Sequence, residues 1–126
     1  MAGKYLIDTN TAIYYLNNQL PATIANELDK ETLNISVITR MELLAWRNAN
    51  TEELAMLEAF IKSATVYNLD ELVILKSIEI RKLYTIKLPD AIIAATALVY
   101  NYTFVTRNTA DFKNIEGLKI INPWIH

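Results

Sequence analysis

The segment Lys4-Tyr5-Leu6-Ile7-Asp8-Thr9-Asn10 is a short apolar run that ends abruptly in polar residues. Its first four residues, 4–7, have the length and character of a buried β-strand. In an open parallel sheet, the functional crevice lies at the carboxyl ends of the strands. Asp8 is therefore a candidate site residue. The alternative is that Asp8 or Thr9 simply caps a following helix.

Beyond this segment, short apolar runs alternate with longer stretches of helical periodicity, without repeats, low-complexity tracts or linkers. The alternation predicts a parallel sheet with helices on both of its faces. We expect strands at residues 4–7, 32–36, 64–68, 103–106 and 118–121. We expect helices at residues 9–17, from 21, at 38–49, from 51, at 71–86 and at 89–100. Pro21 suits a first helical position, and the Thr51 hydroxyl is placed to cap its helix.

The size and composition of the chain predict one folded unit. We expect a single domain over residues 1–126, because this length leaves no room for two independent cores. Hydrophobic residues make up 52% of the chain and charged residues 21%, which is too apolar for a disordered protein. No run is long enough to span a membrane, and the first residues lack a signal-peptide layout, so we expect a cytoplasmic location.

Missing residue types exclude several kinds of site. The chain has no cysteine, and its one histidine is His126. Disulfides, zinc-thiolate sites, Ser-His-Asp triads and Cys-His pairs are thereby excluded. Gly3 and Gly117 are the only glycines, so neither a dinucleotide-binding Gly-rich turn nor a P-loop is present.

The helix expected at 38–49 carries an acid in an unusual place. Positions i, i+3, i+4 and i+7 of this helix are Ile38, Met41, Glu42 and Ala45. This spacing predicts that Glu42 lies within an apolar stripe, where a lone carboxylate is costly without partners. The alternative is that the stripe is the margin of the buried face, so that Glu42 reaches water or pairs with Arg47 or Lys62.

Two further acids lie near predicted element ends. Asp90 opens the helix expected at 89–100, whose body is apolar almost all round and is therefore expected to be buried. A carboxylate in a first helical turn is also favoured by the macrodipole alone, so a purely structural Asp90 is a serious alternative. Asp111 follows the strand expected at 103–106, at the same edge as Asp8, although by itself it is typical of a loop carboxylate.

Asp8, Glu42, Asp90 and Asp111 are more informative as a set. Two unit charges about 5 Å apart repel by roughly 3 kcal/mol at an effective dielectric near 20, so clustered acids favour a bound cation. Oxygen donors without nitrogen or sulfur favour Mg²⁺ or Mn²⁺, and Mg²⁺ takes one or two protein carboxylates together with water and substrate phosphate. This chemistry is suited to phosphoryl transfer and phosphodiester hydrolysis.

The formal net charge of −2 is not that of a typical nucleic-acid-binding protein. With those four of the 14 acids set aside, however, ten remain against 12 basic residues. The basic candidates for phosphate contact are Arg40, Lys82, Lys87, Arg107 and Lys113, of which Arg40, Lys87 and Arg107 are our substrate-binding candidates. Scattered basic residues are equally typical of an ordinary solvated surface.

Four motifs in this order resemble one known family. They are Leu6-Ile7-Asp8-Thr9-Asn10, Glu42, Leu88-Pro89-Asp90-Ala91-Ile92-Ile93-Ala94-Ala95-Thr96-Ala97, and Val105-Thr106-Arg107-Asn108 with Asp111-Phe112. The chain resembles the PIN-domain family, specifically the VapC-type toxins of type II toxin-antitoxin systems. The resemblance covers essentially the whole chain, including Asn122-Pro123 near its end.

The resemblance implies an α/β fold, a three-layer α/β/α sandwich with a short, mainly parallel central sheet. It implies an Mg²⁺-dependent (or Mn²⁺-dependent) endoribonuclease that cuts structured RNA such as tRNA or rRNA. Asp8 and Asp90 would be direct metal ligands, with Glu42 and Asp111 as further ligands or holders of metal-bound water. Supporting polar groups would be Thr9, Asn10, Thr106 and Asn108, with Thr106 a candidate for phosphate contact.

The resemblance also implies partners, namely a VapB-type antitoxin and a second copy of the chain. An apolar surface on the third and fourth helices is a candidate for dimerisation, with ordinary core packing as the alternative. It comprises Leu43, Trp46, Leu57, Phe60 and Ile61.

Other classes fit the residues less well. A receiver-type signalling module needs paired acids after the first strand, and a phosphatase with an aspartyl nucleophile needs Asp-x-Asp, whereas Asn10 occupies the second place. The remaining alternative is a catalytically weak PIN-fold module that binds nucleic acid or a partner.

Overall fold

The computed structural model of the protein describes residues 2–125, so the single histidine, His126, lies outside the described residues. Its sheet has five strands in the order β3-β2-β1-β4-β5, and every neighbouring pair is parallel. The strands are β1 (Ala2–Ile7), β2 (Thr32–Ser36), β3 (Thr65–Tyr67), β4 (Thr103–Val105) and β5 (Ile120–Ile121). The expected parallel sheet is therefore confirmed.

β1 is the central strand and is buried on both faces. Its side chains alternate between two hydrophobic clusters: Tyr5 and Ile7 belong to one, and Leu6 belongs to the other. This is the two-residue period of a strand with a covered sheet on each side. The register with β4 places Ile7 beside Val105, so the residues that follow these two strands are neighbours at one edge.

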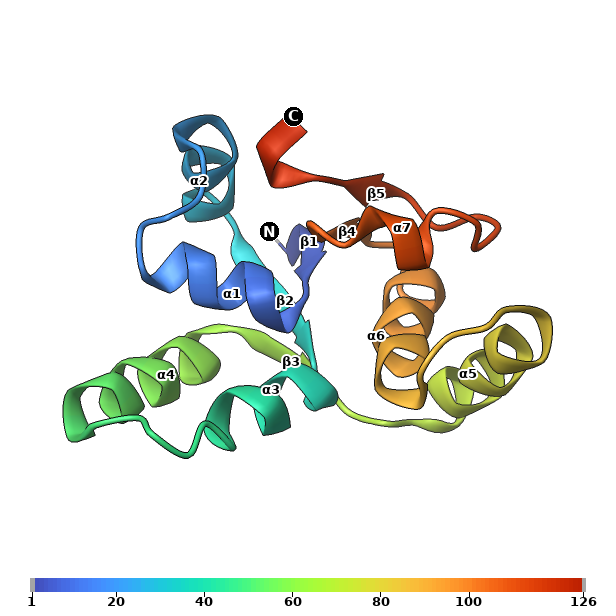
Figure 1. The fold of residues 1–126 in the computed structure, drawn as a ribbon, viewed down its shortest axis with the longest axis horizontal. Coiled ribbons are helices and arrows are strands. Elements are labelled where there is room, and N and C mark those ends of the chain that lie inside the picture. Colours follow the sequence, from blue (N-terminus) through green and yellow to red (C-terminus); the bar gives the residue numbers. More distant parts are fainter. Residues whose placement is uncertain (1, 126) are drawn as a thin grey trace.

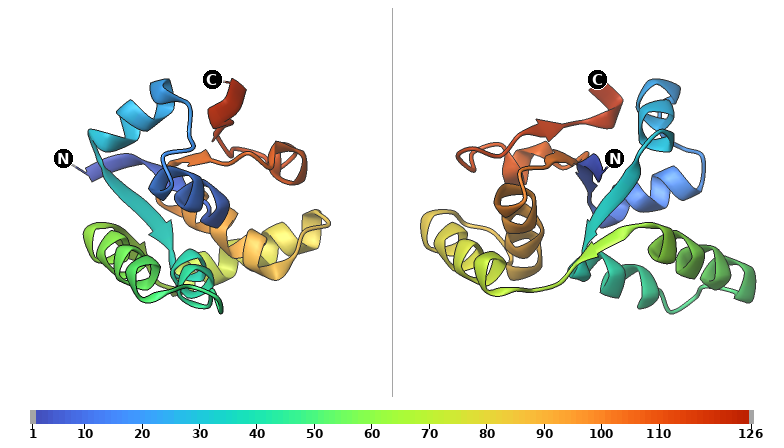
Figure 2. Two further views of the ribbon diagram at one scale, coloured as in Figure 1. Left: turned by 60° about the vertical axis from the view of Figure 1, so that its left-hand side comes forward. Right: turned by 180° about the vertical axis from the view of Figure 1, so that it is seen from behind.

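Helices cover both faces of the sheet, as Figure 1 shows. They are α1 (Thr9–Leu16), α2 (Ala22–Asp29), α3 (Val37–Leu44), α4 (Thr51–Ser63), α5 (Glu71–Leu83), α6 (Leu88–Val99), α7 (Thr109–Phe112) and the 3-10 turn η1 (Pro123–Ile125). In both views of Figure 2, α1, α3 and α4 lie on one side of the sheet, whereas α5 and α6 lie on the other. The expected three-layer α/β/α arrangement is confirmed.

Helix α6 is buried because its sequence is apolar almost all round. Residues 91–97 are all buried, and they pack with Leu6, Phe104 and Phe112. The ring of Phe112 meets that of Phe104 edge-on, with centroids 4.9 Å apart. Only the first turn of α6 reaches the polar edge of the sheet, and that turn carries Asp90.

Several predicted boundaries were wrong. α3 ends at Leu44 rather than at residue 49, and α4 is capped by Asn50 rather than by Thr51. The Asn50 side chain accepts from the Glu53 amide (2.8 Å), while the Glu53 carboxylate accepts from the Asn50 amide (3.1 Å). These reciprocal bonds form a capping box that sets the start of α4 at Thr51.

Other differences lie at element ends. α5 ends at Leu83 rather than at residue 86, and Ile86 packs against the core from the connecting loop. Pro21 is the residue before α2 rather than its first residue. The helix α7 was not expected, because four residues are too few for a periodic pattern.

The apolar residues considered for a dimer surface are mostly core residues. Leu43, Leu57 and Phe60 are buried, and Ile61 packs against the same cluster. Trp46 alone among the five is exposed. Ordinary core packing therefore accounts for most of that set.

Within residues 2–125, no helix is long and apolar enough to cross a membrane.

Candidate functional site

Asp8 and Thr106 follow β1 and β4, the two neighbouring strands between which the strand order of the sheet reverses. From β1 the chain moves to β2 on one side, whereas β4 lies on the other side of β1, so the carboxyl ends of β1 and β4 flank a topological switch point. Ligands bind at such points in open α/β sheets. The Thr106 hydroxyl donates to Asp8 Oδ2 at 2.6 Å. Two strand ends are thereby tied together at the expected edge.

Asp8 also caps α1. Its Oδ1 accepts from the Thr11 amide at 2.8 Å, so the structural alternative for Asp8 is realised in the same side chain. Both carboxylate oxygens are held by donors on different elements. This fixes the orientation of Asp8 without supplying a positive charge.

Glu42 lies on α3, opposite the start of α1. The Thr9 hydroxyl donates to Glu42 Oε1 at 2.5 Å and lies 3.2 Å from the buried Thr39 hydroxyl. The expected burial of Glu42 in an apolar stripe is wrong. Thr39 and Leu43 form the buried side of α3, while Met41 is 61% exposed and Glu42 is itself exposed.

Glu42 has no ion pair in the part of the chain that is described. The ion pair recorded over residues 2–125 joins Lys76 to Glu79, so pairing of Glu42 with Arg47 or Lys62 is not realised. Glu42 therefore faces the site with a threonine hydroxyl as its donor.

Asp111 lies on α7 and is linked back to the strand end. Asn108 Nδ2 donates to Asp111 Oδ2 at 2.8 Å, and the Asn108 amide donates to the Thr106 hydroxyl at 3.1 Å. A chain of hydrogen bonds therefore connects Asp8, Thr106, Asn108 and Asp111. The loop between β4 and α7 orients an acid at each of its ends.

The carboxyl of Asp90 interacts electrostatically with the other three acids. Burial raises the pKa of its carboxyl above the ordinary value, and the charges of Glu42, Asp111 and Asp8 raise it further. Lys87, immediately before the helix, acts in the opposite direction. Because these charges act on one half-buried group, the four expected acids lie at one site, although their chemical roles remain predictions.

Two adjoining cavities open at this edge. One, of about 200 Å³, is lined by Asp8, Thr9, Asn10, Glu42, Asp90, Ile93, Asn108 and Phe112. The other, of about 620 Å³, is lined by Asn10, Arg81, Thr85, Ile86, Lys87, Asp90, Asn108 and Asp111. They share Asn10, Asp90 and Asn108, so Asp90 faces both cavities.

The donor set suits a hard cation, although the acids are spread apart. Across residues 2–125, no three acidic or histidine side chains are gathered closely enough to form a ready-made metal group. Mg²⁺ needs only one or two protein carboxylates and fills its other positions with water and substrate oxygen. Asp8 and Asp90 line one cavity and fit that requirement, with Glu42 on the same cavity and Asp111 on the adjoining one.

Only some of the basic residues proposed for phosphate contact line the polar cavities. Lys87 lines the larger cavity, and so does Arg81 from the last turn of α5, a residue that the sequence reasoning missed. Arg81 could have been suspected from the sequence because it lies in the last turn of the helix that precedes the Asp90 motif. Arg40 and Lys113 are exposed on α3 and after α7 and are absent from both cavity linings.

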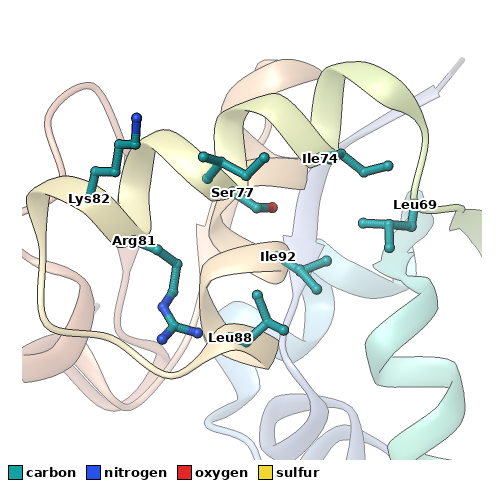
Figure 3. Close-up of a pocket in the computed structure, with 8 residues that line it drawn as sticks. Leu69, Ile74, Ser77, Arg81, Lys82, Leu88 and Ile92 are labelled. Atoms are coloured by element: carbon teal, nitrogen blue, oxygen red, sulfur yellow. The ribbon is translucent and has the colours of Figure 1, made fainter.

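Lys82 belongs to a different hollow, between α5 and α6. Figure 3 shows Leu88 and Ile92 on α6 facing Ile74, Ser77 and Arg81 on α5. This groove, of about 450 Å³, is lined mainly by apolar side chains. It is separate in character from the polar cavities, although Arg81 lines both it and the larger polar cavity.

Comparisons with known proteins identify the family to which this fold belongs. Residues 5–118 match the PIN domain family. A 37-residue stretch is 51% identical to a protein named Ribonuclease VapC from Rickettsia bellii, and it covers 29% of this chain and 28% of that protein.

Solved structures match over nearly the full chain. The DNA-bound VapBC of Salmonella typhimurium is 30% identical with a TM-score of 0.81, covering 96% of this chain and 98% of that chain. A toxin-antitoxin complex from Klebsiella pneumoniae is 30% identical with a TM-score of 0.76, covering 94% and 97%. VapBC2 from Rickettsia felis, bound to a promoter DNA fragment, is 26% identical with a TM-score of 0.79, covering 94% and 97%. With the family match spanning all four acids, this chain belongs to the PIN domain family and is of the VapC type.

Proposed function

We propose that this protein is a metal-dependent endoribonuclease that acts as the toxin of a VapBC-type pair. The observation that carries the proposal is that Asp8, Glu42 and Asp90 line one cavity at the strand ends, while Asp111 lines the adjoining cavity with Asp90. Burial and the charges of Glu42, Asp111 and Asp8 accordingly raise the pKa of Asp90. Like charges gathered at a strand-end cavity are unfavourable in the free protein and become favourable once a cation is bound. Asp8, Glu42, Asp90 and Asp111 are the proposed catalytic acids.

Mg²⁺ or Mn²⁺ is the proposed cofactor, with Asp8 and Asp90 as direct ligands. When bound, such an ion would supply Lewis-acid polarisation of a scissile phosphate and would make a nearby water more acidic. Glu42 and Asp111 would hold and orient water at the same site.

The remaining residues position these acids. Thr106 and the Thr11 amide fix the Asp8 carboxylate, Thr9 holds Glu42, and Asn108 holds Asp111. Asn10 lines both cavities and offers an amide to substrate. Because these donors are neutral, they orient the carboxylates without cancelling the charge that attracts a cation.

Lys87 and Arg81 are the proposed contacts to the RNA backbone at this cavity. Both line the larger cavity beside Asp90, where a phosphate would approach the acids. Their positive charge offsets the repulsion between phosphate and carboxylates. We propose structured RNA, such as tRNA or rRNA, as the substrate.

A VapB-type antitoxin is the proposed partner. The support is the likeness to chains in structures described as VapBC or toxin-antitoxin complexes. The test is co-expression with the neighbouring reading frame, followed by purification of the pair and a cleavage assay. Cleavage that is equal with and without the partner would contradict this role.

The decisive experiment is cleavage of total cellular RNA with Mg²⁺, with Mn²⁺ and in chelator. The native chain should cut with either ion and should fail in chelator. Asp8→Asn should be inactive, whereas Glu58→Gln, which neutralises an exposed acid on α4, should cut as the native chain does. Full activity in chelator would exclude the metal mechanism.

One observation favours a second candidate, a PIN-fold module that binds nucleic acid or a partner without turnover. Among residues 2–125, no three acidic side chains form a ready-made metal group. RNA binding that is independent of Mg²⁺, with no cleavage, would favour this candidate over the nuclease.

We also propose a homodimer, with a revised contact surface. Several large apolar side chains of α5 are exposed, including Leu72 at 61%, Leu75 at 55% and Ile78 at 49%. This α5 surface replaces the set on the third and fourth helices, in which Trp46 alone is exposed. A dimeric mass at tens of micromolar that becomes monomeric in Leu75→Asp is the expected result, and a monomeric native chain would contradict it.

A further inference from the structure

Arg107 forms an exposed platform with two aromatic residues beside the acid site. Its guanidinium carbon lies 4.9 Å from the centroid of the Trp124 ring and 5.9 Å from that of Tyr14. The two rings meet edge-on with centroids 5.7 Å apart, and Arg107 Nη1 donates to the Tyr14 hydroxyl at 3.4 Å. We call Tyr14, Arg107 and Trp124 the Arg107 platform.

The fold brings these three residues together from distant parts of the chain. β5 pairs with β4, and the Thr106 amide donates to the Ile121 carbonyl at 3.0 Å. Asn122 then accepts from the Trp124 amide at 2.9 Å, which sets the turn η1. Tyr14 comes from α1, whose first residue follows Asp8. The same two strand ends that hold the acids therefore also build the platform.

The platform is adjacent to the acid site through the backbone. Arg107 stands between Thr106, which donates to Asp8, and Asn108, which donates to Asp111. Neighbouring residues are about 3.8 Å apart between Cα atoms. Arg107 itself lines neither polar cavity, so a ligand held at the acids would reach it by extending past the turn between β4 and α7.

The charge of Arg107 is available to a ligand. Arg107 is exposed, and Trp124 is 39% exposed. Within residues 2–125 the recorded ion pair is Lys76–Glu79, so Arg107 is held by aromatic rings rather than by a carboxylate. The Tyr14–Trp124 contact already fastens η1 to α1, so an anchoring role does not require a cation at this position.

Planar cations and indole rings are suited to one class of ligand. Single-stranded RNA presents unstacked bases, which stack on aromatic rings and on arginine guanidinium planes, and phosphates, which attract the arginine charge. A protein partner would also contact this surface, but the combination of stacking planes with an unpaired cation favours a nucleotide.

We propose that the Arg107 platform stacks a base of single-stranded RNA next to the phosphate held at the acid site. This inference rests on the proposed nuclease function and adds a base-binding subsite to it. It predicts that the substrate is opened locally at the cut, because a paired base is not free to stack.

The test compares two short single-stranded RNAs in chelator, where cleavage does not interfere. One has all of its bases, and the other has the same sugar-phosphate backbone with an abasic nucleotide at each position in turn. Native binding should weaken for at least one abasic position. Trp124→Ala should bind the complete RNA about 5-fold to 100-fold more weakly and should lose the distinction between the two RNAs.

Matched variants separate stacking from charge and from folding. Trp124→Phe keeps an aromatic face and should retain most of the affinity, whereas Arg107→Lys keeps the charge but loses the planar group and should weaken it. Trp46→Ala removes the other tryptophan, which lies after α3, and should bind as the native chain does. Circular dichroism establishes that each variant is folded.

A second measurement uses the tryptophan itself. In Trp46→Phe, Trp124 is the only tryptophan, and a stacked base should quench its fluorescence on addition of the complete RNA but not of the critical abasic RNA. Equal quenching by both, or no difference between Trp124→Ala and the native chain, would overturn the platform. Base-dependent binding without cleavage in Mg²⁺ would support the platform while excluding the nuclease.

Discussion

Asp70 and Asp90 stand at the starts of two neighbouring helices, yet their carboxyl groups are shifted in opposite directions. Asp70 caps α5, and Asp90 lies in the first turn of α6. A hydrogen bond from the Tyr100 hydroxyl, followed by one from the Val73 amide, lowers the pKa of Asp70. Burial, followed by the charges of Glu42, Asp111 and Asp8, raises the pKa of Asp90.

The difference lies in the neighbours rather than in the helices. A helix N-terminus stabilises a carboxylate in both cases, but the effect is modest and confined to the first turn. At Asp90 it is outweighed by burial and by three like charges, whereas at Asp70 it is reinforced by two donors. The carboxyl of Asp70 is therefore surrounded by hydrogen-bond donors, whereas that of Asp90 is surrounded by other acids.

The largest expected difference is in RNA cleavage. Asp90→Asn should lower the cleavage rate about 100-fold or more, because it removes a proposed metal ligand while keeping the side-chain shape. Asp70→Asn should remain close to native activity at a temperature where it is folded. The measurement is initial rates on one RNA in millimolar Mg²⁺. Equal losses in both variants would remove the functional distinction between the two acids.

The next difference is in the response of stability to Mg²⁺. At ten times the dissociation constant, a ligand of the folded state alone stabilises it by about 1.4 kcal/mol. The native chain and Asp70→Asn should therefore melt several degrees higher in Mg²⁺ than in chelator, and Asp90→Asn should lose most of this rise. Differential scanning fluorimetry measures all three. Choline chloride at matched ionic strength controls for screening, and a native chain that does not respond to Mg²⁺ would contradict the cation site.

A smaller difference, opposite in sign, is expected for stability without metal. In chelator, Asp90→Asn relieves repulsion worth on the order of 1 kcal/mol, so it should melt about 4 °C above the native chain. Asp70→Asn loses a charged acceptor for Tyr100 and should melt below the native chain. If Asp90→Asn also melts lower, Asp90 is a helix-terminus residue of the same kind as Asp70.

The smallest difference is in the pH dependence of these two effects. A raised folded-state pKa makes stability fall as pH rises from the ordinary carboxyl value through the raised value. Asp90→Asn should therefore gain its advantage over the native chain in that window and should lose it in acid. A lowered pKa acts oppositely, since the contribution of Asp70 is present above its unfolded pKa and is lost as pH falls through its folded pKa. Melting curves in chelator from acid to neutral pH should converge in acid and diverge in opposite directions at neutral pH.

The residues at the carboxyl ends of the strands were the part of the site that could be predicted from the sequence. Asp8 and Thr106 follow short apolar runs, and parallel strands end at a common edge, so their meeting follows from local pattern and sheet topology. Asp90 was likewise placed by the apolar body of α6. The fold class followed from the same alternation of apolar runs and helical periods.

The orientation of α3 was not predictable in the same way. The apolar residues of α3 fall on two sides of the helix, so the sequence allows either side to be buried. Thr39 and Leu43 are buried, and Met41 and Ala45 are not, because the first pair faces α1 and β2. Arg81 was missed because its approach to Asp90 depends on how α5 packs along α6. The meeting of Tyr14 with Trp124 joins residues at opposite ends of the chain, which a local pattern does not reveal.

The Thr106–Asp8 hydrogen bond joins residues 98 positions apart, and this has a consequence for a newly made chain. Asp8, Glu42 and Asp90 are all synthesised before β4, but the strand that carries Thr106 must be inserted beside β1 before the cavity has its second wall. Chains are extended at about 5 to 20 residues per second, so a ribosome-bound chain spends seconds without that wall. Until β4 is inserted beside β1, Asp8 lacks its Thr106 donor and the acids lack the strand end that faces them, so the site is completed late in the order of synthesis.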